Sequence, residues 1–264
     1  MLKFICLGSG SSGNGYYLWT ESGGILIDAG LGIKTLKRHF QTFDLPVSQL
    51  LAVFITHDHA DHIKSGGKLV SEYGLKVYTT ELVHEGIGRN YCVSPRLHDE
   101  NRVSIVKDVP FTIGDFVVTP FEVPHDSTDC VGYRVEACGI RFCLITDVGH
   151  VTDRIKEEVE AANYLVLESN HDHEMLMAGP YPPYLKERIA GPTGHLSNTE
   201  AAELLAKKTE GAFGDPAGYE ECLYRMPDGK MFLYGAGGEA SPYAEETIKR
   251  ISAANADKWL ADNK

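Results

Sequence analysis

The segment His57-Asp58-His59-Ala60-Asp61-His62 decides the fold of this chain, and it comes directly after the apolar run Leu51–Thr56. The apolar run predicts a buried β-strand. The six residues after it gather three imidazoles and two carboxylates, whose nitrogens and oxygens are ligands of Zn²⁺ and other first-row ions. In an extended backbone His57 and His59 point to the same side and can share one ion, while the last two residues can turn toward a second. The alternative is a solvated polar loop, which would have no use for this density of ligands.

Strand and helix patterns alternate on both sides of this segment. Before it, strands are expected over Leu2–Leu7, Tyr16–Thr20 and Ile25–Asp28, and a helix over Lys34–Phe43. After it come a helix over Ile63–Tyr73, a strand over Val77–Thr79 and a helix over Glu81–Arg89. Closely spaced strands then follow over Val103–Val106, Phe111–Ile113, Phe116–Phe121, Val131–Ala137 and Ile140–Thr146. Two groups of strands with helices outside each group predict an α/β fold of four layers, with two sheets packed face to face.

The last third returns to helices around a few strands. We expect a helix over Asp153–Ala162, a strand over Tyr164–Glu168, and helices over Pro183–Ile189 and Asn198–Lys208. A hairpin joins Cys222–Met226 to Lys230–Tyr234, and a last helix covers about Pro242–Leu260. The chain shows no internal repeat and no convincing linker, so we expect a single domain over residues 1–264.

Composition limits the functions that the chain can have. Its 264 residues are 43% hydrophobic and 23% charged, as in ordinary globular proteins. The formal net charge of −12 argues against indiscriminate binding of nucleic acid or anionic membrane, which needs a basic face. Basic residues are dispersed along the sequence, and Lys186 and Arg188 are the modest candidates for contacting a nucleic-acid backbone. No apolar run reaches the length of a membrane span, and six scattered cysteines without an export signal indicate a cytoplasmic protein.

The His-x-His-x-Asp-His motif after a buried strand resembles that of the metallo-β-lactamase superfamily, and the resemblance extends along most of the chain. It implies one metallo-β-lactamase-like αβ/βα sandwich domain over residues 1–264. His125 then corresponds to the third histidine of the first ion, and Asp147 to a carboxylate that bridges two ions. Asp28 corresponds to an aspartate that supports the ligand loop. An ordinary loop histidine and a turn-capping aspartate are the alternatives for His125 and Asp147.

Shorter runs resemble the WalJ/YycJ-type subgroup, which is similar in layout to ribonuclease Z and whose members are described as nucleases or as uncharacterised hydrolases. These runs are Gly8–Asn14, Leu167–Asp172, Tyr181-Pro182 with Leu185–Ile189, and Gly194–Asn198. The subgroup resemblance implies that His195 transfers a proton near the scissile phosphate. Ser9, Ser11 and Asn14 are candidate donors to substrate phosphate, and the alternative is that their hydrogen bonds stabilise the turn itself. The Gly8-x-Gly10-x-x-Gly13 pattern also fits dinucleotide binding, but the β-like sequence after it excludes the helix that such binding requires.

One departure from the family concerns the second ion. Ribonuclease Z-like proteins end their last strand in a ligand histidine, whereas this chain has Gly235 there and no histidine after His195. The second ion would therefore have Asp61, His62 and the bridging Asp147. Water or one of three side chains would complete the site: His195, His171 or Glu239. Otherwise the second site is weak and the protein often holds a single ion.

These residues predict a metal-dependent hydrolase with two divalent transition-metal ions, Zn²⁺ or Mn²⁺, with Fe²⁺ as a further option. Two such ions lower the pKa of a shared water and stabilise an in-line displacement at phosphorus. The leading hypothesis is a phosphodiesterase or nuclease that uses this metal-bridging hydroxide on DNA, RNA or a nucleotide, with His195 protonating the leaving oxygen. The alternatives are an acyl hydrolase acting on a thioester, lactone or β-lactam, and a metal-binding protein with a degraded second site.

Overall fold

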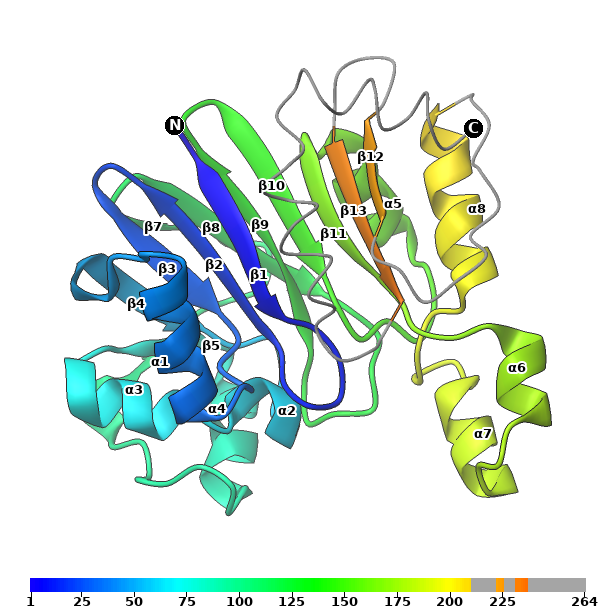
Figure 1. Ribbon diagram of the computed structural model, residues 1–264, viewed down its shortest axis with the longest axis horizontal. Helices are drawn as coiled ribbons and strands as arrows, with labels where there is room; N and C mark the ends of the chain where they lie inside the picture. The colour runs from blue at the N-terminus through cyan, green and yellow to red at the C-terminus, as the bar shows by residue number, and fades with distance from the viewer. Residues whose placement is uncertain (210–221, 226–230, 237–264) are drawn as a thin grey trace.

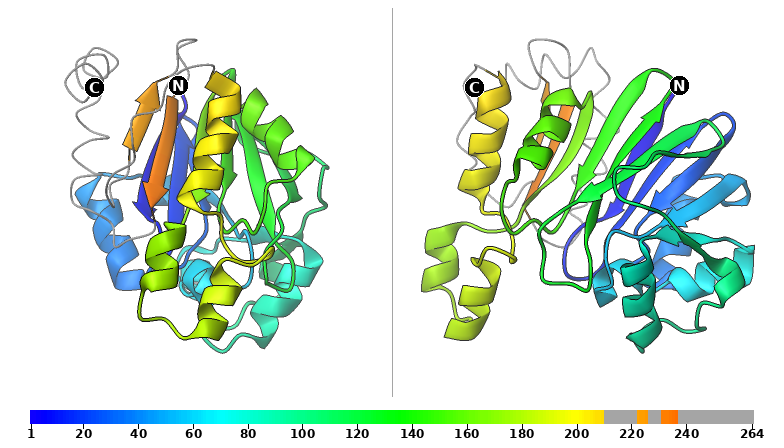
Figure 2. Two further views of the ribbon diagram at one scale, coloured as in Figure 1. Left: turned by 90° about the vertical axis from the view of Figure 1, so that its right-hand side faces the viewer. Right: turned by 180° about the vertical axis from the view of Figure 1, so that it is seen from behind.

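The computed structural model describes residues 1–209, 222–225 and 231–236 (Figure 1). Within these residues two β-sheets pack face to face, and helices cover the outer face of each (Figure 2). The predicted four-layer α/β sandwich is confirmed. The helix expected over Pro242–Leu260 lies outside the described residues. Among the helices that are described, none is both long enough and apolar enough to cross a membrane.

The first sheet forms from the amino-terminal part of the chain. Its strand order is β1 (Lys3–Gly8), β2 (Gly15–Thr20), β3 (Gly23–Ile27), β4 (Leu50–Phe54), β5 (Val77–Thr79) and β6 (Arg102–Ser104). β1 to β3 pair antiparallel and β3 to β6 pair parallel. The helices α1 (Ile33–Thr42), α3 (Gly66–Tyr73) and α4 (Glu81–Arg89) cover its outer face, with short turns at η1 (Val47–Gln49) and η2 (Asp99–Asn101). Parallel strands with crossover helices put the loops that follow β4 and β5 at one edge.

The second sheet has the order β12 (Cys222–Arg225), β13 (Met231–Ala236), β11 (Tyr164–Ser169), β10 (Ile140–Ile145), β9 (Val131–Ala137), β8 (Phe116–Glu122) and β7 (Phe111–Ile113). α5 (Asp153–Ala161) and α8 (Asn198–Thr209) cover its outer face. β12 and β13 pair antiparallel, as the predicted hairpin requires. β11 pairs parallel with both β10 and β13, so their carboxyl ends meet at one edge of the sheet.

The inner faces of the two sheets share one apolar core. Alternate residues of β2 to β5 meet alternate residues of β8 to β11 there, as the two-residue period of a strand requires. Phe54 of the first sheet packs edge-on against Tyr133 of the second, with ring centroids 5.5 Å apart. The Tyr133 hydroxyl donates a hydrogen bond of 2.6 Å to the Ile55 carbonyl. This buried polar contact fixes the carboxyl end of β4, where the histidine segment begins.

The helix predicted over Ile63–Tyr73 is wrong in one respect, because the structure divides it into α2 (Ala60–Ile63) and α3. The break falls at Ser65, whose backbone N–H donates to the Ala29 carbonyl at 2.7 Å and whose hydroxyl donates to the Leu31 carbonyl. The Ser65 N–H, which a continuous helix would pair internally, is thus bonded to the loop before α1 instead. The break leaves α2 as a single turn that follows the histidine segment directly.

Two short helices project beyond the sandwich. α6 (His173–Ala178) and α7 (Pro183–Ile189) extend from the carboxyl end of β11, at the lower right of Figure 1. The sequence predicted α7 but not α6, which begins where the Asp172 carboxylate caps the Met175 N–H. The two helices flank the edge at which the loops of both sheets meet (Figure 2).

Candidate metal and catalytic site

The predicted site residues follow the carboxyl ends of strands in both sheets. His57 to His62 follow β4, His125 follows β8, Asp147 follows β10, and His195 lies between α7 and α8. A cavity of about 320 Å³ opens among these loops. Its lining includes His59, Asp61, Asp147, Glu168, Arg188 and His195. The sandwich therefore brings together residues that are more than 130 positions apart in the sequence.

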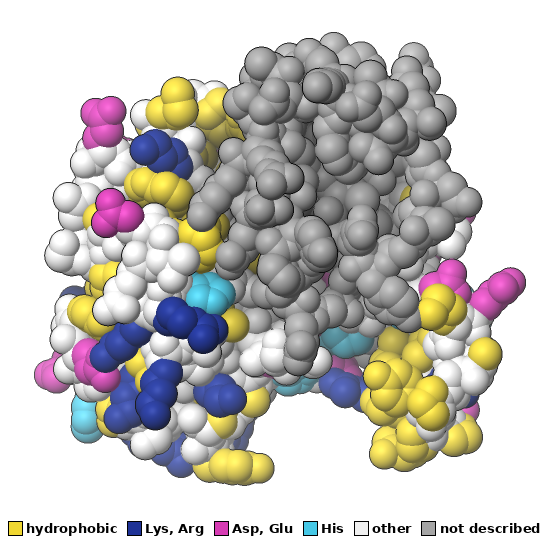
Figure 3. Space-filling view, in the orientation of Figure 1, with side chains coloured by type: hydrophobic (Ala, Val, Ile, Leu, Met, Phe, Trp, Pro, Cys, Tyr) yellow, Lys and Arg dark blue, Asp and Glu magenta, His cyan; other side chains and the backbone are white. Residues whose placement is uncertain are grey.

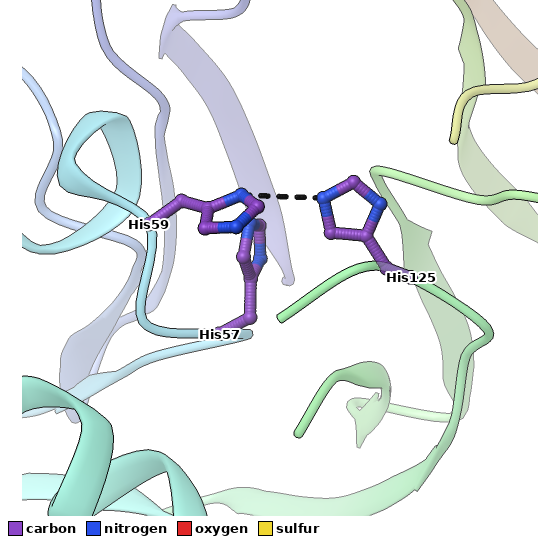
Figure 4. A group of neighbouring side chains, drawn as sticks. All are labelled: His57, His59 and His125. Carbon is purple, nitrogen blue, oxygen red and sulfur yellow. Dashed lines mark hydrogen bonds between the residues drawn. The ribbon is translucent and has the colours of Figure 1, made fainter. Parts of the chain in front are cut away.

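Three histidines form the first group of candidate ligands. One ring nitrogen each of His57, His59 and His125 lies within 4.8 Å of the other two, and the rings converge on one space (Figure 4). His59 Nδ1 and His125 Nε2 are 3.3 Å apart. The other ring nitrogens have partners: Thr56 Oγ1 lies 3.1 Å from His57 Nδ1, and the Gly194 carbonyl lies 3.0 Å from His125 Nδ1. Such outer contacts orient histidine ligands toward a metal.

The buried nitrogen of His57 tests whether this group fits a cation. His57 is fully buried, and its Nε2 has no hydrogen-bond partner in the part of the chain that the structure describes. An unpaired buried polar atom is costly, so it calls for an unseen partner. Burial and the neighbouring imidazoles hold the pKa of His57 well below its usual range, which keeps the ring neutral. A neutral, buried imidazole nitrogen aimed at two other imidazoles fits a divalent metal ion.

Asp147 lies between two further groups. His57, His62 and Asp147 form one and His125, His195 and Asp147 form the other, each with ligand atoms within 4.8 Å. One oxygen of Asp147 is 2.9 Å from His62 Nε2, and the other is 3.3 Å from His195 Nδ1. Although burial opposes it, the imidazoles hold the pKa of Asp147 well below its usual range. Its two oxygens thus contact different histidines, which suits a carboxylate shared by two ions.

Asp28 supports the ligand segment from beneath. Its carboxylate accepts hydrogen bonds from the Thr56 backbone N–H at 2.8 Å and from the Thr56 hydroxyl at 3.0 Å. Its second oxygen lies 2.7 Å from His62 Nδ1, which directs Nε2 of that ring at Asp147. All of these groups are buried. Asp28 and Asp147 both have left-handed backbone conformations, with φ of 62° and 51°.

Asp61 lies at the margin of the site. Its carboxylate lines the cavity, 3.7 Å from His62 Nε2, but it belongs to none of the three groups found among the described residues. Its backbone packs against Gly30, where a Cβ atom would meet the Asp61 carbonyl oxygen at 1.5 Å. Asn14, from the turn before β2, donates to that same carbonyl through its backbone N–H at 2.7 Å. The turn therefore forms a wall of the cavity, and the chain continues from it into a strand.

Glu168 is the residue that the sequence reasoning missed. Its Oε1 lies 2.7 Å from His195 Nδ1, and its Oε2 accepts the backbone N–H groups of Val148 at 2.6 Å and Leu196 at 3.2 Å. Burial works against a charged imidazole, but this hydrogen bond and the charges of Glu168 and Asp147 raise the pKa of His195 to about 9. The sequence did contain a signal for Glu168, because this glutamate stands at the end of a predicted strand and within the family-like run Leu167–Asp172. The sequence analysis gave it no role.

The residues considered for completing the second metal site lie in different places. Gly235 pairs in register with Glu168 on the neighbouring strand, so it stands beside the cavity edge of the sheet. The backbone of His171 forms an isolated β-bridge with Ser197, and its side chain belongs to none of the ligand groups found among the described residues. Glu239 lies outside the described residues. His195 is the one candidate that joins a group with Asp147 within the described chain.

Arg188 and Lys186, the predicted contacts for a nucleic-acid backbone, both have partners. Arg188 lines the cavity and donates to both oxygens of Asp126, at 2.5 Å from Nε and 3.0 Å from a terminal nitrogen. Lys186 Nζ donates to the Met177 carbonyl of α6 at 2.5 Å. Arg188 is thus fixed at the rim of the cavity, and Lys186 links the two projecting helices.

Comparisons with known proteins identify the family and the fold of this chain. The family model described as Beta-lactamase superfamily domain matches residues 24–212. An exodeoxyribonuclease named YycJ from Bacillus anthracis is 38% identical to this chain over 205 residues. One named WalJ from Streptococcus pneumoniae is 35% identical over 205 residues, and each match covers 78% of this chain and 76% of the relative. The solved structure of the metallo-β-lactamase fold protein YhfI from Bacillus subtilis superimposes with a TM-score of 0.58 at 20% identity, over 79% of this chain and 82% of that one.

Proposed function

Because this chain belongs to the β-lactamase superfamily, we propose that it is a metal-dependent nuclease that hydrolyses phosphodiester bonds at the ends of DNA. The observation that carries the proposal is the three-histidine group at the cavity together with the partly buried Glu168–His195 pair that lines it. The names of the two relatives, both exodeoxyribonucleases, support DNA as the substrate and a chain end as the point of attack.

The fold and the histidine–aspartate cluster imply divalent metal ions. We assign His57, His59 and His125 to one ion, with Zn²⁺ or Mn²⁺ as the metal. We assign His62 and Asp147, which are 2.9 Å apart, to a second ion, together with Asp61, whose carboxylate is 3.7 Å from His62 Nε2. His195 contacts Asp147 through Nδ1, the same nitrogen that contacts Glu168, so we leave it out of the second set. Ions bound there would supply Lewis acidity that activates water and offsets the charge of a phosphate. The nitrogen-rich first set is the tighter site, since its three donors are aligned by their own hydrogen bonds.

His195 is the group that we assign to proton transfer. Its Nδ1 is held by Glu168, so Nε2 is the ring nitrogen left to meet a substrate. A pKa of about 9 keeps the imidazole protonated at neutral pH. The proton at Nε2 would pass to the oxygen of the departing nucleotide as the phosphodiester bond breaks. Glu168 positions the ring, because its other oxygen accepts the backbone N–H groups of Val148 and Leu196.

The turn that lines the cavity before β2 would hold the phosphate. Ser9 and Ser11 line the cavity on the turn before β2, as does Asn14. We assign to this turn the contacts with the nonbridging oxygens of the phosphate under attack. Arg188 on the rim would add a positive charge near the next phosphate along the strand, since its pairing with Asp126 holds it in place.

Hydrolysis assays test the proposed function. The purified protein, loaded with Mn²⁺ or Zn²⁺ and its metal content measured by elemental analysis, is incubated with end-labelled single-stranded DNA, duplex DNA and RNA. A cyclic nucleotide, a thioester and a chromogenic β-lactam are included to test the competing reactions. We expect release of mononucleotides from DNA ends. Metal-loaded protein that cleaves no DNA, or that turns over the acyl substrates instead, would contradict the proposal.

A further inference from the structure

Five basic side chains gather on the helical layer outside the first sheet. Lys34, Lys37 and Arg38 come from α1, and Lys64 and Lys68 come from the segment of α2 and α3. We call these five residues the basic face. Figure 3 shows Lys and Arg side chains gathered on the part of the surface that lies over α1 and α3 in Figure 1. We propose that the basic face binds the sugar–phosphate backbone of DNA outside the catalytic cavity, an inference that rests on the proposed function.

Contacts between the helices explain why distant residues share this face. The break at Ser65 is bonded to the Ala29 and Leu31 carbonyls just before α1, so the start of α1 lies beside the end of α2. Farther along, Lys37 Nζ lies 2.5 Å from the Glu72 carboxylate of α3. The apolar sides of α1 and α3 are buried in one core, which leaves their basic sides to face solvent together.

The charge of this face contrasts with the rest of the protein. α1 carries three basic residues and no acidic one. Glu72, the acid of α3, pairs with Lys37, and the other four cations have no ion-pair partner within the described residues. The whole chain has a formal charge of −12. An acidic molecule with one basic face repels a polyanion elsewhere and steers it toward that face.

The basic face starts close to the cavity. Asp61 of α2 lines the cavity, and Lys64 follows it by three residues, or about one helical turn. Lys34 and Lys68 continue the face away from the cavity on α1 and α3. Since α1 has ten residues, it is about 15 Å long. One DNA strand presents a phosphate about every 3.4 Å along the duplex axis, so the face could contact roughly four phosphates.

This position suits the part of the substrate that is not being cleaved. A chain end in the cavity would place the adjoining backbone over the α2–α3 break and then along α1. The contacts would go to phosphates alone, so they would bind DNA without regard to sequence. A nuclease that digests DNA from an end needs such a contact, because every sequence must pass the cavity.

Charge reversal tests the proposal. The variant Lys34→Glu/Lys68→Glu is compared with the control Lys3→Glu/Lys156→Glu, which makes the same charge change on β1 and α5. Metal-loaded proteins are titrated with fluorescent phosphorothioate duplex DNA between 50 and 200 mM salt. Losing two phosphate contacts should lower the slope of log affinity against log salt by roughly 1.8 and weaken binding at least about tenfold. The control should stay within about twofold of the unaltered protein.

Three outcomes separate this inference from the proposed function. If the unaltered protein binds DNA through the basic face but hydrolyses no phosphodiester, the proposed function falls and the inference stands. If it digests DNA while both double variants bind with the same affinity and salt slope as the unaltered protein, the inference falls and the function stands. A reduced DNA kcat/KM, with a much smaller change for the small diester bis(4-nitrophenyl) phosphate, would support both. Lys34→Gln/Lys68→Gln repeats the test if thermal unfolding shows that the charge reversal destabilises the fold.

Discussion

The imidazole rings of His57 and His195 lie in opposite electrostatic environments. We call the segment that follows β4 the first wall of the site, and the residues around Asp147, Glu168 and His195 the second wall. On the wall after β4, burial and neighbouring rings keep His57 neutral, and its Nε2 has no partner within the described chain. On the wall after β11, Glu168 holds His195 at 2.7 Å and raises its pKa to about 9. Under the proposed function, one wall would present lone pairs to a cation and the other would present a proton to a substrate. The same side chain serves two kinds of chemistry because the groups behind it differ.

The largest expected effect is on the first wall. His59→Ala removes one donor of the three-histidine group, so the first ion should be lost and DNA hydrolysis with it. The loss should exceed the roughly 10–100-fold that removing a mere supporting contact costs. Elemental analysis after gel filtration and a DNA digestion assay measure both effects. Full metal content together with full activity would show that the cation-binding wall has been misidentified.

On the second wall, His195→Ala should lower kcat on DNA by about 10²–10⁴-fold, the usual contribution of a general acid. The metal content should be unchanged, because the three-histidine group is intact. Elemental analysis of the same samples provides the control. A variant that instead loses one ion would make His195 a ligand of the second site, which its 3.3 Å contact with Asp147 allows.

Asp28→Asn tests the support beneath the first wall. The amide keeps the shape of the side chain but removes the negative charge of the carboxylate that Thr56 and His62 contact. Metal affinity should fall about 10–100-fold, as for other outer contacts of ligand histidines. Competition with a fluorescent chelator measures the affinity, and excess metal should restore activity. If excess metal gives no recovery, Asp28 has a role beyond positioning.

The smallest effect is a change in pH dependence on the second wall. Glu168→Gln removes the charge that raises the pKa of His195, so that pKa should fall from about 9 toward its ordinary value near 6.5. Activity that needs protonated His195 disappears as the pH rises through this pKa. The alkaline limb of the kcat profile should therefore move to lower pH in the variant. An unmoved limb, with metal content equal to that of the unaltered protein, would separate Glu168 from proton transfer.

The difference between the walls also explains what the sequence could predict. The first wall is mostly one contiguous segment, so spacing alone predicted His57, His59, Asp61 and His62 as metal ligands. The second wall is assembled from ends of separate strands and loops, and there the resemblance to a family supplied Asp147 and His195 as candidates. Neither spacing nor resemblance gave a role to Glu168, whose partners lie 20 to 28 residues away.

Prediction of the fold succeeded and failed for related reasons. Periodicity and glycine turns located the strands of both sheets, because each pattern is local. The break between α2 and α3 depends on bonds from Ser65 to carbonyls more than 30 residues earlier, so a local pattern could not reveal it. The basic face escaped notice for the same reason. Its residues look dispersed along the chain, and the α1–α3 contacts bring them together.

The left-handed backbone at Asp28 has a consequence for the replacement of that residue. A side chain in that conformation destabilises a fold by about 1 kcal/mol relative to glycine, although aspartate tolerates it better than most residues. Replacing Asp28 by glycine would relieve this strain but leave the buried Thr56 and His62 groups without the carboxylate that they contact. A buried donor left unpaired costs about 1–3 kcal/mol, so the glycine variant should be less stable than the unaltered protein. The carboxylate therefore holds its own residue in the strained conformation.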